Sequence, residues 1–314
     1  MGDRMHTFVV CAYGNSPFLN VCLESLLAQN VGSRVLIATS TPNEEIRSAA
    51  KAYGLEVIVN RRGQGIAQDW NFALQQAKTP LVTLAHQDDV YLPDYTKKVL
   101  AAYRKNRDAI ILFTDYQELR EADSSLEEAE ILNHSGVVLR NFEVEQPEYG
   151  MEEPDSESES MLFDPKRADS NQDQMWHTAQ SRLIRIKHLM LSPLRVPVFR
   201  RSIWIRRRVL SLGNPICCPS VTYVRSRIPQ KLFAGDMRSN IDWQAWEQLS
   251  RRKGSFVYLP EVLMLHRIHS GSTTSELVSD HARRQEDLYM FRKFWPGKIP
   301  EWIWRFYGEN EKYQ

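Results

Sequence analysis

The first 115 residues alternate between two hydrophobic periods. Short apolar runs of strand length are separated by segments whose apolar residues recur every three or four positions, as on one face of a helix. The predicted strands are 7–13, 34–39, 55–60, 80–85 and 109–115. The predicted helices are 16–29, with Ser16 as its cap and Pro17 in its first turn, 44–53, 66–77 and 93–107. This order predicts an α/β fold with a mostly parallel, Rossmann-like sheet and helices on both faces.

The chain from residue 180 onward predicts a second, more helical part. Amphipathic helices are expected over 181–195, 199–213 and 241–252, the second of them ending at Gly213. Strand-like composition returns at 213–226, 255–260 and 261–269. A helical C-terminal extension follows, whose regularly spaced aromatic residues predict docking on the core, with anchoring at a membrane interface as the alternative.

Residues 118–178 interrupt the alternation of strands and helices. Within them, residues 143–173 hold eleven acidic residues against two basic ones, and few apolar residues. Such a segment cannot bury enough apolar surface to offset the entropy of ordering, so we expect a mobile surface insertion, poorly ordered from about 144 to 174. A lid that regulates the site or binds a partner is the alternative. The predicted parts of the chain are therefore 1–117, 118–178, 179–275 and 276–314.

Composition limits the class of protein. Of 314 residues, 42% are hydrophobic, enough for a sizeable core, and the net charge is +1. This balance does not favour nucleic acid as a partner, although residues 182–208 hold nine basic residues and no acidic one. The four cysteines lack metal-binding spacing and predict reduced, packed thiols. The first ten residues do not resemble a signal peptide, and no apolar run is long enough to span a membrane. We therefore expect a cytoplasmic protein, with the basic segment as a candidate for peripheral contact at the inner face of the membrane.

The most informative motif is the end of the predicted strand at 80–85. It is followed by His86, Gln87 and two neighbouring acids, Asp88 and Asp89. In parallel sheets, ligands bind beyond the carboxyl ends of the strands. Mg²⁺ and Mn²⁺ are hard cations, which one or two carboxylates bind together with diphosphate oxygens. The motif predicts a divalent metal site that holds a diphosphate, although an isolated pair of acids would more often form a solvated turn.

Three segments, in order along the chain, resemble the nucleotide-sugar transferases of glycosyltransferase family 2, which have the GT-A fold. The segments are TFVVCAYGNSPFLNVCLESLLAQ, GQGIAQDWNFALQQAKTPLVTLAHQDD and HRIHSGSTT. The resemblance covers residues 7–116 and 213–275. It implies a nucleotide-sugar-binding half in 1–117, an acceptor-side half in 179–275 and an activity of the hexosyltransferase type.

The resemblance also implies a role for each acid of the motif. Asp89 resembles the acid that binds the metal, and Asp88 resembles the acid that faces the ribose and the metal. The cation, Mg²⁺ or Mn²⁺, would stabilise the departing nucleoside diphosphate. His86 stands where family members often have an acid, which leaves the division of roles between the two remaining acids open.

Further donor-binding residues are expected near the ends of the strands. The candidates are Ala12, Tyr13, Ser40, Asp69 and Asn71. Ser40 follows the second strand, where family members commonly carry an acid, and Asp69 is a substitute for that missing charge. The alternatives are that Ser40 and Thr41 cap the following helix and that Asn71 ties loops together.

The predicted helix at 241–252 carries the candidates for a catalytic base. An inverting transfer needs a carboxylate near the acceptor hydroxyl to take up its proton. Asp242 resembles the acid near the acceptor in the family, although Ile241 precedes it where the family has a second acid. A helix N-cap is the alternative for Asp242, and Glu247 is the second candidate for the base.

Imidazole and guanidinium groups follow the apolar run at 261–265. His266 is a candidate metal ligand, and Arg267 can bind phosphate with two parallel hydrogen bonds. His269 lies beside them, so we expect the three residues to close over the diphosphate. Structural roles are the alternative. The segment 213–223 is expected to line the acceptor side.

These residues together predict a metal-dependent inverting glycosyltransferase that moves a sugar from a nucleoside diphosphate donor to a hydroxyl acceptor. The family implies a glycan or lipid-linked acceptor and a role in surface polysaccharide or glycan assembly. A nucleotidyltransferase is an alternative, but the glycine-rich triphosphate loop with a lysine is missing near the first strand. A catalytically inactive nucleotide-sugar-binding module is another, against which the joint presence of Asp88, Asp89 and Asp242 argues.

Overall fold

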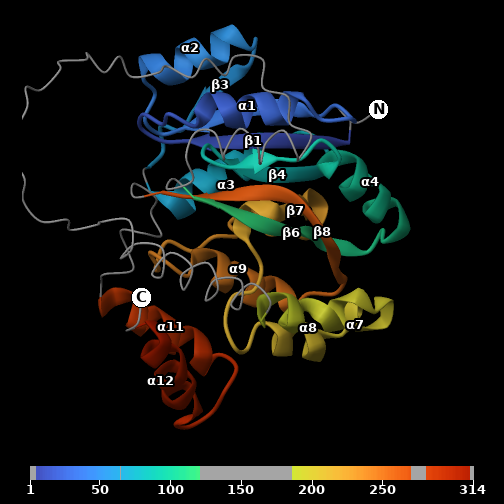
Figure 1. Cartoon of the computed structure of the whole chain (residues 1–314), viewed down its shortest axis with the longest axis vertical. Helices are drawn as coiled ribbons and strands as arrows, with labels where there is room; N and C mark the ends of the chain where they lie inside the picture. Colours follow the sequence, from blue (N-terminus) through green and yellow to red (C-terminus); the bar gives the residue numbers. More distant parts are fainter. Residues whose placement is uncertain (1–4, 64, 121–185, 270–280, 312–314) are drawn as a thin grey trace, which may run out of the picture.

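The computed structural model describes residues 5–63, 65–120, 186–269 and 281–311 (Figure 1). Within them, eight strands form one sheet in the order β3-β2-β1-β4-β7-β6-β8-β5. The strands are β1 (His6–Ala12), β2 (Arg34–Thr39), β3 (Glu56–Val59), β4 (Leu81–His86), β5 (Val90–Tyr91), β6 (Ala109–Arg120), β7 (Val221–Val224) and β8 (Ser255–Ile268).

The sheet is parallel in its first half and mixed in its second. β3, β2, β1 and β4 are parallel neighbours, as the alternation of strands and helices predicts. β7 lies between β4 and β6 and is antiparallel to both. β6 and β8 are parallel, whereas the short β5 is antiparallel to β8. The sequence did not predict that a strand from residues 221–224 would separate β4 from β6.

Helices cover both faces of the sheet (Figure 1). They are α1 (Leu19–Leu27), α2 (Glu44–Ala52), α3 (Ile66–Gln76), α4 (Tyr95–Lys105), α7 (Pro197–Arg201), α8 (Ile203–Val209), α9 (Ile241–Ser250), α11 (His281–Arg292) and α12 (Ile299–Glu311). Successive residues of β1 serve the two faces, since side chains alternate along a strand. Phe8 and Val10 pack with α1, α2 and α4, whereas Val9 packs in the cluster that includes α3, α9 and α11.

Several predicted element ends were wrong. α1 begins at Leu19 with Phe18 at its N-cap, and the Ser16 hydroxyl only accepts a bond of 3.4 Å from the Phe18 amide. The helix predicted over 199–213 is divided at Ser202, whose side chain caps α8 by accepting from the Ile205 amide. The strands predicted at 255–260 and 261–269 form one continuous strand, β8, with irregular pairing to β6.

The two flanks of the predicted insertion show how far the described fold extends. β6 continues to Arg120, past the boundary predicted at 117. The segment from 144 to 174, for which we expect poor order, lies outside the described residues.

At the C-terminal end, Phe291 of α11 and Ile303 of α12 are buried in the core. None of the described helices combines the length and the apolar character needed to cross a bilayer. All four cysteines are free thiols.

Candidate active site

Asp89 is fully buried in the turn between β4 and β5. The pairing of β5 with β8 brings the end of β8 beside this turn. One carboxylate oxygen, Oδ1, accepts a hydrogen bond of 3.0 Å from the Arg267 amide and lies 2.9 Å from His266 Nδ1. The other oxygen, Oδ2, accepts no hydrogen bond from the described residues. A buried carboxylate oxygen without a donor is costly, so this atom fits a cation.

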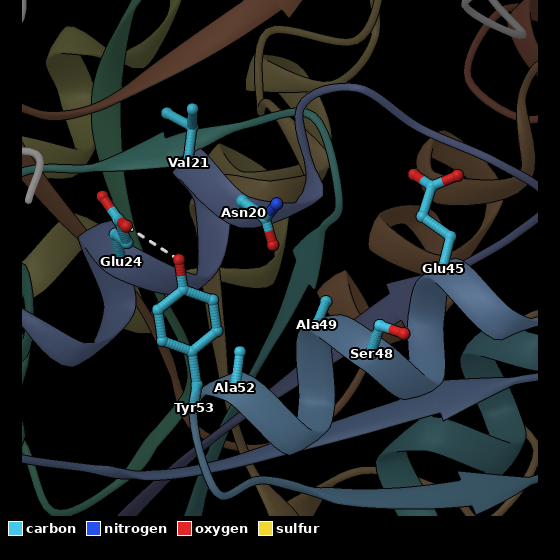
Figure 2. Close-up of a pocket in the computed structure, with 8 residues that line it drawn as sticks. All are labelled: Asn20, Val21, Glu24, Glu45, Ser48, Ala49, Ala52 and Tyr53. Carbon is cyan, nitrogen blue, oxygen red and sulfur yellow. Dashed lines mark hydrogen bonds between the residues drawn. The ribbon is translucent and has the colours of Figure 1, made fainter. Parts of the chain in front are cut away.

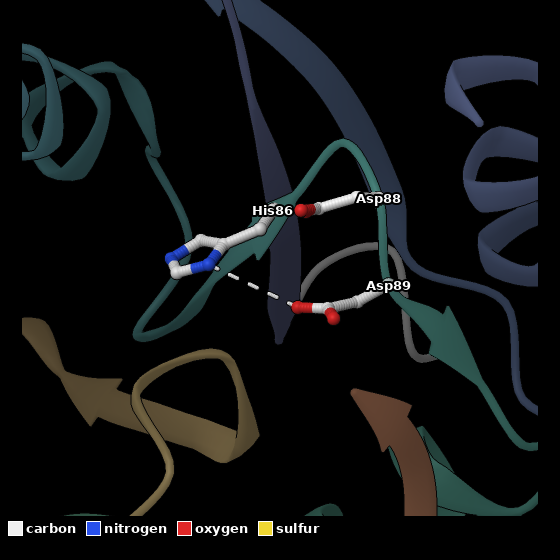
Figure 3. Close-up of side chains that lie close together, drawn as sticks. All are labelled: His86, Asp88 and Asp89. Carbon is white, nitrogen blue, oxygen red and sulfur yellow. Dashed lines mark ion pairs between the residues drawn. The ribbon is translucent and has the colours of Figure 1, made fainter. Parts of the chain in front are cut away.

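His86, Asp88 and Asp89 form the group that can hold this cation. Their ligand atoms lie within 4.8 Å of one another, and Figure 3 shows the three side chains on one side of the turn. His86 Nδ1 is 3.9 Å from Asp89 Oδ2, and the imidazole stacks on the Trp70 ring at 5.1 Å. Burial lowers the pKa of His86, although both aspartates oppose this shift. A neutral imidazole and two carboxylates match the ligands that Mn²⁺ and Mg²⁺ accept.

His266 lies beside the buried acid of the turn. Its Nδ1 contacts Asp89 directly, so the ring lies beside the acid as a hydrogen-bond partner. Burial alone would lower the pKa of His266, but the charges of Asp89 and Asp88 outweigh it and raise that pKa. A histidine that ligates a metal commonly holds a carboxylate with its other ring nitrogen, so a ligand role for His266 stays a prediction. His86, which the sequence marked only as a departure from the family, is a further candidate ligand beside Asp88 and Asp89.

Arg267 and His269 hold Asp88 in position. Arg267 is 1% exposed, its Nε donates to the Asp88 carbonyl at 3.0 Å, and its guanidinium lies 4.2 Å from the centre of the Phe18 ring. His269 Nε2 lies 3.2 Å from Asp88 Oδ2. These contacts join α1, the turn and the end of β8. Contact of Arg267 or His269 with a diphosphate stays a prediction.

Ser40 and Asp69 lie together at the ends of β2 and β3. The Ser40 hydroxyl donates to Asp69 Oδ2 at 2.7 Å, and the Asn60 amide donates to Asp69 Oδ1 at 2.8 Å. Gly65 precedes α3 with a φ of 116°, which favours glycine and starts the helix that carries Asp69. Beside this network is a hollow of about 440 Å³, lined by Ser40, Pro42, Arg47, Val59, Asn60, Arg61 and Gly63.

Residues near the ends of β1 and β2 have other roles than helix capping. Asn43, not Ser40 or Thr41, caps α2 by accepting from the Ile46 amide at 2.8 Å. The Thr41 hydroxyl accepts from the Gly14 amide and thereby holds the loop after β1. Ala12, the last residue of β1, is buried, whereas Tyr13 in the loop is 62% exposed. Tyr13 therefore presents its ring to solvent at the carboxyl edge of the sheet.

Asn71 ties α3 to a distant loop. Its Oδ1 accepts from the amides of Leu232 and Phe233, and its Nδ2 donates to the Phe233 and Ala67 carbonyls. Both the oxygen and the nitrogen of the side-chain amide are hydrogen-bonded within the protein. These bonds agree better with the alternative, in which Asn71 ties loops together, than with donor binding.

The two candidate bases differ sharply in their surroundings. Asp242 is the second residue of α9, and Asn240 holds the N-cap position, so the capping alternative is wrong. Its carboxylate accepts from Asn214 Nδ2 at 2.6 Å and from the Trp243 amide at 2.7 Å, and burial raises its pKa to about 6. Glu247 is 4% exposed and pairs with Arg207 and Arg251. Two guanidinium groups thus hold Glu247, whereas Asp242 accepts hydrogen bonds from neutral donors; a base role for either acid stays a prediction.

The comparison with known families identifies the first half of the chain. Residues 7–152 match the sequence profile of Glycosyl transferase family 2. This segment belongs to that family. The match includes the turn with His86, Asp88 and Asp89 but ends before Asp242, so it covers the predicted donor half and not the predicted resemblance at 213–275.

Solved structures extend the similarity beyond residue 152 at the level of the fold. S. aureus TarS 1-349 in complex with UDP-GlcNAc has a TM-score of 0.52 and 13% identity, covering 91% of this chain and 64% of that one. The mannosyltransferase PcManGT from Pyrobaculum calidifontis, in complex with GDP-Man and Mn²⁺, has a TM-score of 0.52 and 12% identity, covering 92% and 63%. The chain thus spans less than two thirds of either neighbour. The predicted GT-A fold is confirmed. No curated protein matches the sequence.

Sequence reasoning missed two residues near the site, Gln87 and Lys187, of which Lys187 connects the two halves of the chain. Gln87 brackets the Tyr13 backbone, accepting from its amide and donating to its carbonyl, both at 2.9 Å. Lys187 donates to the Tyr116 hydroxyl at 2.9 Å, and the Tyr116 ring meets His266 edge-on at 6.0 Å. The only sequence signal for Lys187 was its place in the basic segment.

The thiol of Cys217 indicates that the turn and Asp242 face a common region. Burial raises its pKa, and the charges of Asp89 and Asp242 both add to that shift, while Lys187 opposes it. An electrostatic effect of this kind requires that both carboxylates lie near the thiol. Cys217 therefore lies near both Asp89 and Asp242, and the expected lining of the acceptor side by 213–223 stays a prediction.

A second hollow lies away from these residues. It has a volume of about 370 Å³ and lies between α1 and α2, where the Tyr53 hydroxyl donates to Glu24 at 2.7 Å (Figure 2). Its lining consists of Asn20, Val21, Glu24, Glu45, Ser48, Ala49, Ala52 and Tyr53. None of the predicted site residues is among them.

Proposed function

We propose that this protein is a metal-dependent inverting glycosyltransferase that moves a sugar from a nucleoside diphosphate to a hydroxyl acceptor. The observation that carries the proposal is the buried carboxylate of Asp89 in a family 2 segment. Its Oδ1 is fixed by the Arg267 amide and its Oδ2 accepts no hydrogen bond from the described residues, with Asp88 and His86 close by. Such a group favours a bound divalent cation over a solvated turn.

His86, Asp88 and Asp89 would hold Mg²⁺ or Mn²⁺. When bound, the cation supplies positive charge against the departing diphosphate. The similar mannosyltransferase in complex with GDP-Man and Mn²⁺ supports this choice. His266 orients Asp89 through the contact of its Nδ1 with Oδ1. Arg267 holds the Asp88 backbone through the 3.0 Å bond from its Nε to the Asp88 carbonyl.

The nucleoside would occupy the hollow at the ends of β2 and β3. The Ser40, Asp69 and Asn60 network gives that hollow a polar floor, and Tyr13 offers an exposed ring at the neighbouring edge. Aromatic rings stack readily on nucleobases. Arg47 and Arg61 line the same hollow and suit an anionic ligand.

Asp242 would act as the base. It would accept the proton of the acceptor hydroxyl while the hydroxyl oxygen attacks the anomeric carbon from the side opposite to the diphosphate, which inverts the configuration. Hydrogen bonds from Asn214 and the Trp243 amide orient the carboxylate for this step. The acceptor would be a glycan or lipid-linked hydroxyl in surface polysaccharide assembly, with the protein in the cytoplasm.

The test compares Asp89→Asn with Asp242→Asn. First, a thermal-shift screen of nucleoside diphosphate sugars with Mn²⁺ identifies the donor, because ligands that bind the native state raise its melting temperature. Asp89→Asn should then lose the Mn²⁺-dependent shift. Asp242→Asn should keep it and lose transfer by at least about a hundredfold, since general base catalysis contributes at least that much.

Asp94→Asn is the matched control, since Asp94 is a half-buried acid at the N-cap of α4 that pairs with Lys97. It should leave binding and transfer unchanged. If Asp89→Asn retains the Mn²⁺-dependent shift, the metal assignment is wrong. If both aspartate variants lose donor binding equally, Asp242 is not a base. Release of pyrophosphate from a nucleoside triphosphate would instead identify a nucleotidyltransferase.

A further inference from the structure

Residues 195–204, which include α7 and the start of α8, expose bulky apolar side chains. Val198 and Trp204 are 67% and 64% exposed. Val196, Phe199 and Ile203 are also exposed, and α7 buries none of its residues. We call this region the α7–α8 surface. Single exposed apolar residues are ordinary, but such a cluster in one short segment indicates contact with another surface.

Arginines surround these apolar side chains. Arg195, Arg201 and Arg208 are exposed. The Arg208 guanidinium lies 5.6 Å from the centre of the Trp204 ring and 4.5 Å from that of Trp295, so Trp204 and a cation form one unit. Arg201 pairs with Asp108, but the stretch 182–208 itself holds nine basic residues and no acidic one. The surface therefore combines apolar side chains with positive charge.

The α7–α8 surface lies near the amino-terminal ends of β6 and β8, whereas the candidate active site lies beyond the carboxyl end of β4. Arg201 contacts Asp108 just before β6, and Arg206 donates to the Gly254 carbonyl just before β8. β6 and β8 run in the same direction as β4, because β7 is antiparallel to both β4 and β6. Asp88 and Asp89 follow the carboxyl end of β4. In Figure 1, α7, α8 and α12 lie at one end of the long axis.

We propose that the α7–α8 surface docks on an anionic lipid bilayer. Trp204, Phe199 and Val198 would enter the interfacial region, where amphipathic and aromatic side chains are stable. Arg195, Arg201 and Arg208 would remain at the level of the lipid phosphates and pair with them. This proposal is independent of the proposed sugar transfer, since none of these residues belongs to the candidate active site.

Charge decides between a bilayer and the two rival occupants. A two-fold contact between copies of this chain would set the same arginines against each other. A nucleic acid would match the arginines, but it would not cover valine and isoleucine side chains, which gain little from phosphate contacts. An anionic bilayer matches both the charge and the apolar character.

The test is sedimentation of the full chain with vesicles. Vesicles of phosphatidylcholine with phosphatidylglycerol should bind the protein, vesicles of phosphatidylcholine alone should bind it weakly, and added salt should reduce binding. Trp204→Ser should weaken binding about tenfold, since it removes a large apolar group that the bilayer would bury. Arg201→Gln should weaken it about fivefold, as expected for one cation at the surface.

Two matched variants serve as controls. Leu27→Ser removes an exposed apolar side chain from the end of α1, and Arg34→Gln breaks an exposed ion pair with Glu56 that resembles the pair of Arg201 and Asp108. Both should bind vesicles like the unaltered chain. Melting temperatures and near-ultraviolet circular dichroism verify that every variant is folded.

The outcomes separate the rivals. Equal binding to both kinds of vesicle, or full binding by Trp204→Ser, would overturn the proposal. So would the absence of vesicle binding together with a concentration-dependent dimer that Trp204→Ser abolishes, which would assign the surface to a second copy. Loss of transfer with vesicle binding intact would affect only the proposed function.

Discussion

A buried carboxylate is unfavourable unless hydrogen bonds or a cation compensate for lost hydration. Asp89 and Asp242 resolve this in different ways. Asp89 is held by the Arg267 amide and His266 on one oxygen, while its other oxygen accepts no hydrogen bond from the described residues. Asp242 receives bonds from Asn214 and the Trp243 amide, and burial still raises its pKa to about 6. Each environment suits the role proposed for its acid.

At this scale, transfer should depend on the ionisation of Asp242. The base must be deprotonated, so kcat/KM should fall about tenfold for each pH unit below a midpoint near 6. Asn214→Ala removes a hydrogen bond that favours the charged carboxylate, so the midpoint should move to higher pH. A pH profile of both forms checks this, and an unchanged midpoint in Asn214→Ala would remove Asn214 from the role of positioning residue.

The same raised pKa predicts a change in stability. A carboxyl group whose pKa rises from 3.8 to about 6 on folding stabilises the fold in its protonated form. That contribution, up to about 3 kcal/mol, is present below pH 4 and is lost as the pH rises through 6. Asp242→Asn, which stays neutral, should therefore be more stable than the unaltered chain at pH 8 and should lose that advantage near pH 4. Chemical denaturation at both pH values tests this.

At the scale of elements, side chains within helices join parts of the chain that are far apart in sequence. Asn71 of α3 makes four bonds, three of them to the loop at 232–233. Glu247 of α9 connects α8 to the end of its own helix through Arg207 and Arg251. In the sequence, both residues are candidates for ligand binding or catalysis. The local sequence around a polar residue of a helix does not show which distant residues it contacts.

Asn71→Ala should weaken the fold without abolishing donor binding. Two backbone amides and a carbonyl of the loop would lose their partner, which costs about 1–3 kcal/mol for an unsatisfied buried group. Gln75→Ala is the control, since Gln75 makes one exposed bond to the same loop, to the Gln230 carbonyl. Thermal unfolding with and without the donor measures both effects. If Asn71→Ala loses donor binding but keeps normal stability, Asn71 binds the donor and this prediction is wrong.

Glu247→Gln separates the two acids of α9. Because the carboxylate is buried between Arg207 and Arg251, removing its charge leaves a cation without its partner and should cost about 1–3 kcal/mol of stability. Transfer by the folded variant should persist. A folded Glu247→Gln protein that binds the donor but is inactive would make Glu247 the base instead of Asp242.

At the scale of the whole molecule, the described residues on the two sides of the predicted insertion share one sheet and its hydrophobic core. The core clusters draw on strands and helices from both sides of the predicted insertion, with α3 and α9 packed on one face. Deletion of residues 146–172 should therefore leave the melting temperature within a few degrees of the intact chain, because an acidic segment with few apolar residues contributes little burial. Calorimetry tests this, and a broadened or strongly lowered transition would mean that the segment belongs to the structure.

The sequence by itself determined the local features of this protein. Hydrophobic periodicity depends on neighbours within a few residues, so it sufficed for the parallel half of the sheet, the helices between its strands and the acids at the end of β4. Only the tertiary structure decided that β7 separates β4 from β6, that β8 brings His266 and Arg267 to Asp89, and that Asn71 binds a loop. Those outcomes depend on contacts between residues more than a hundred positions apart, and no local pattern records them.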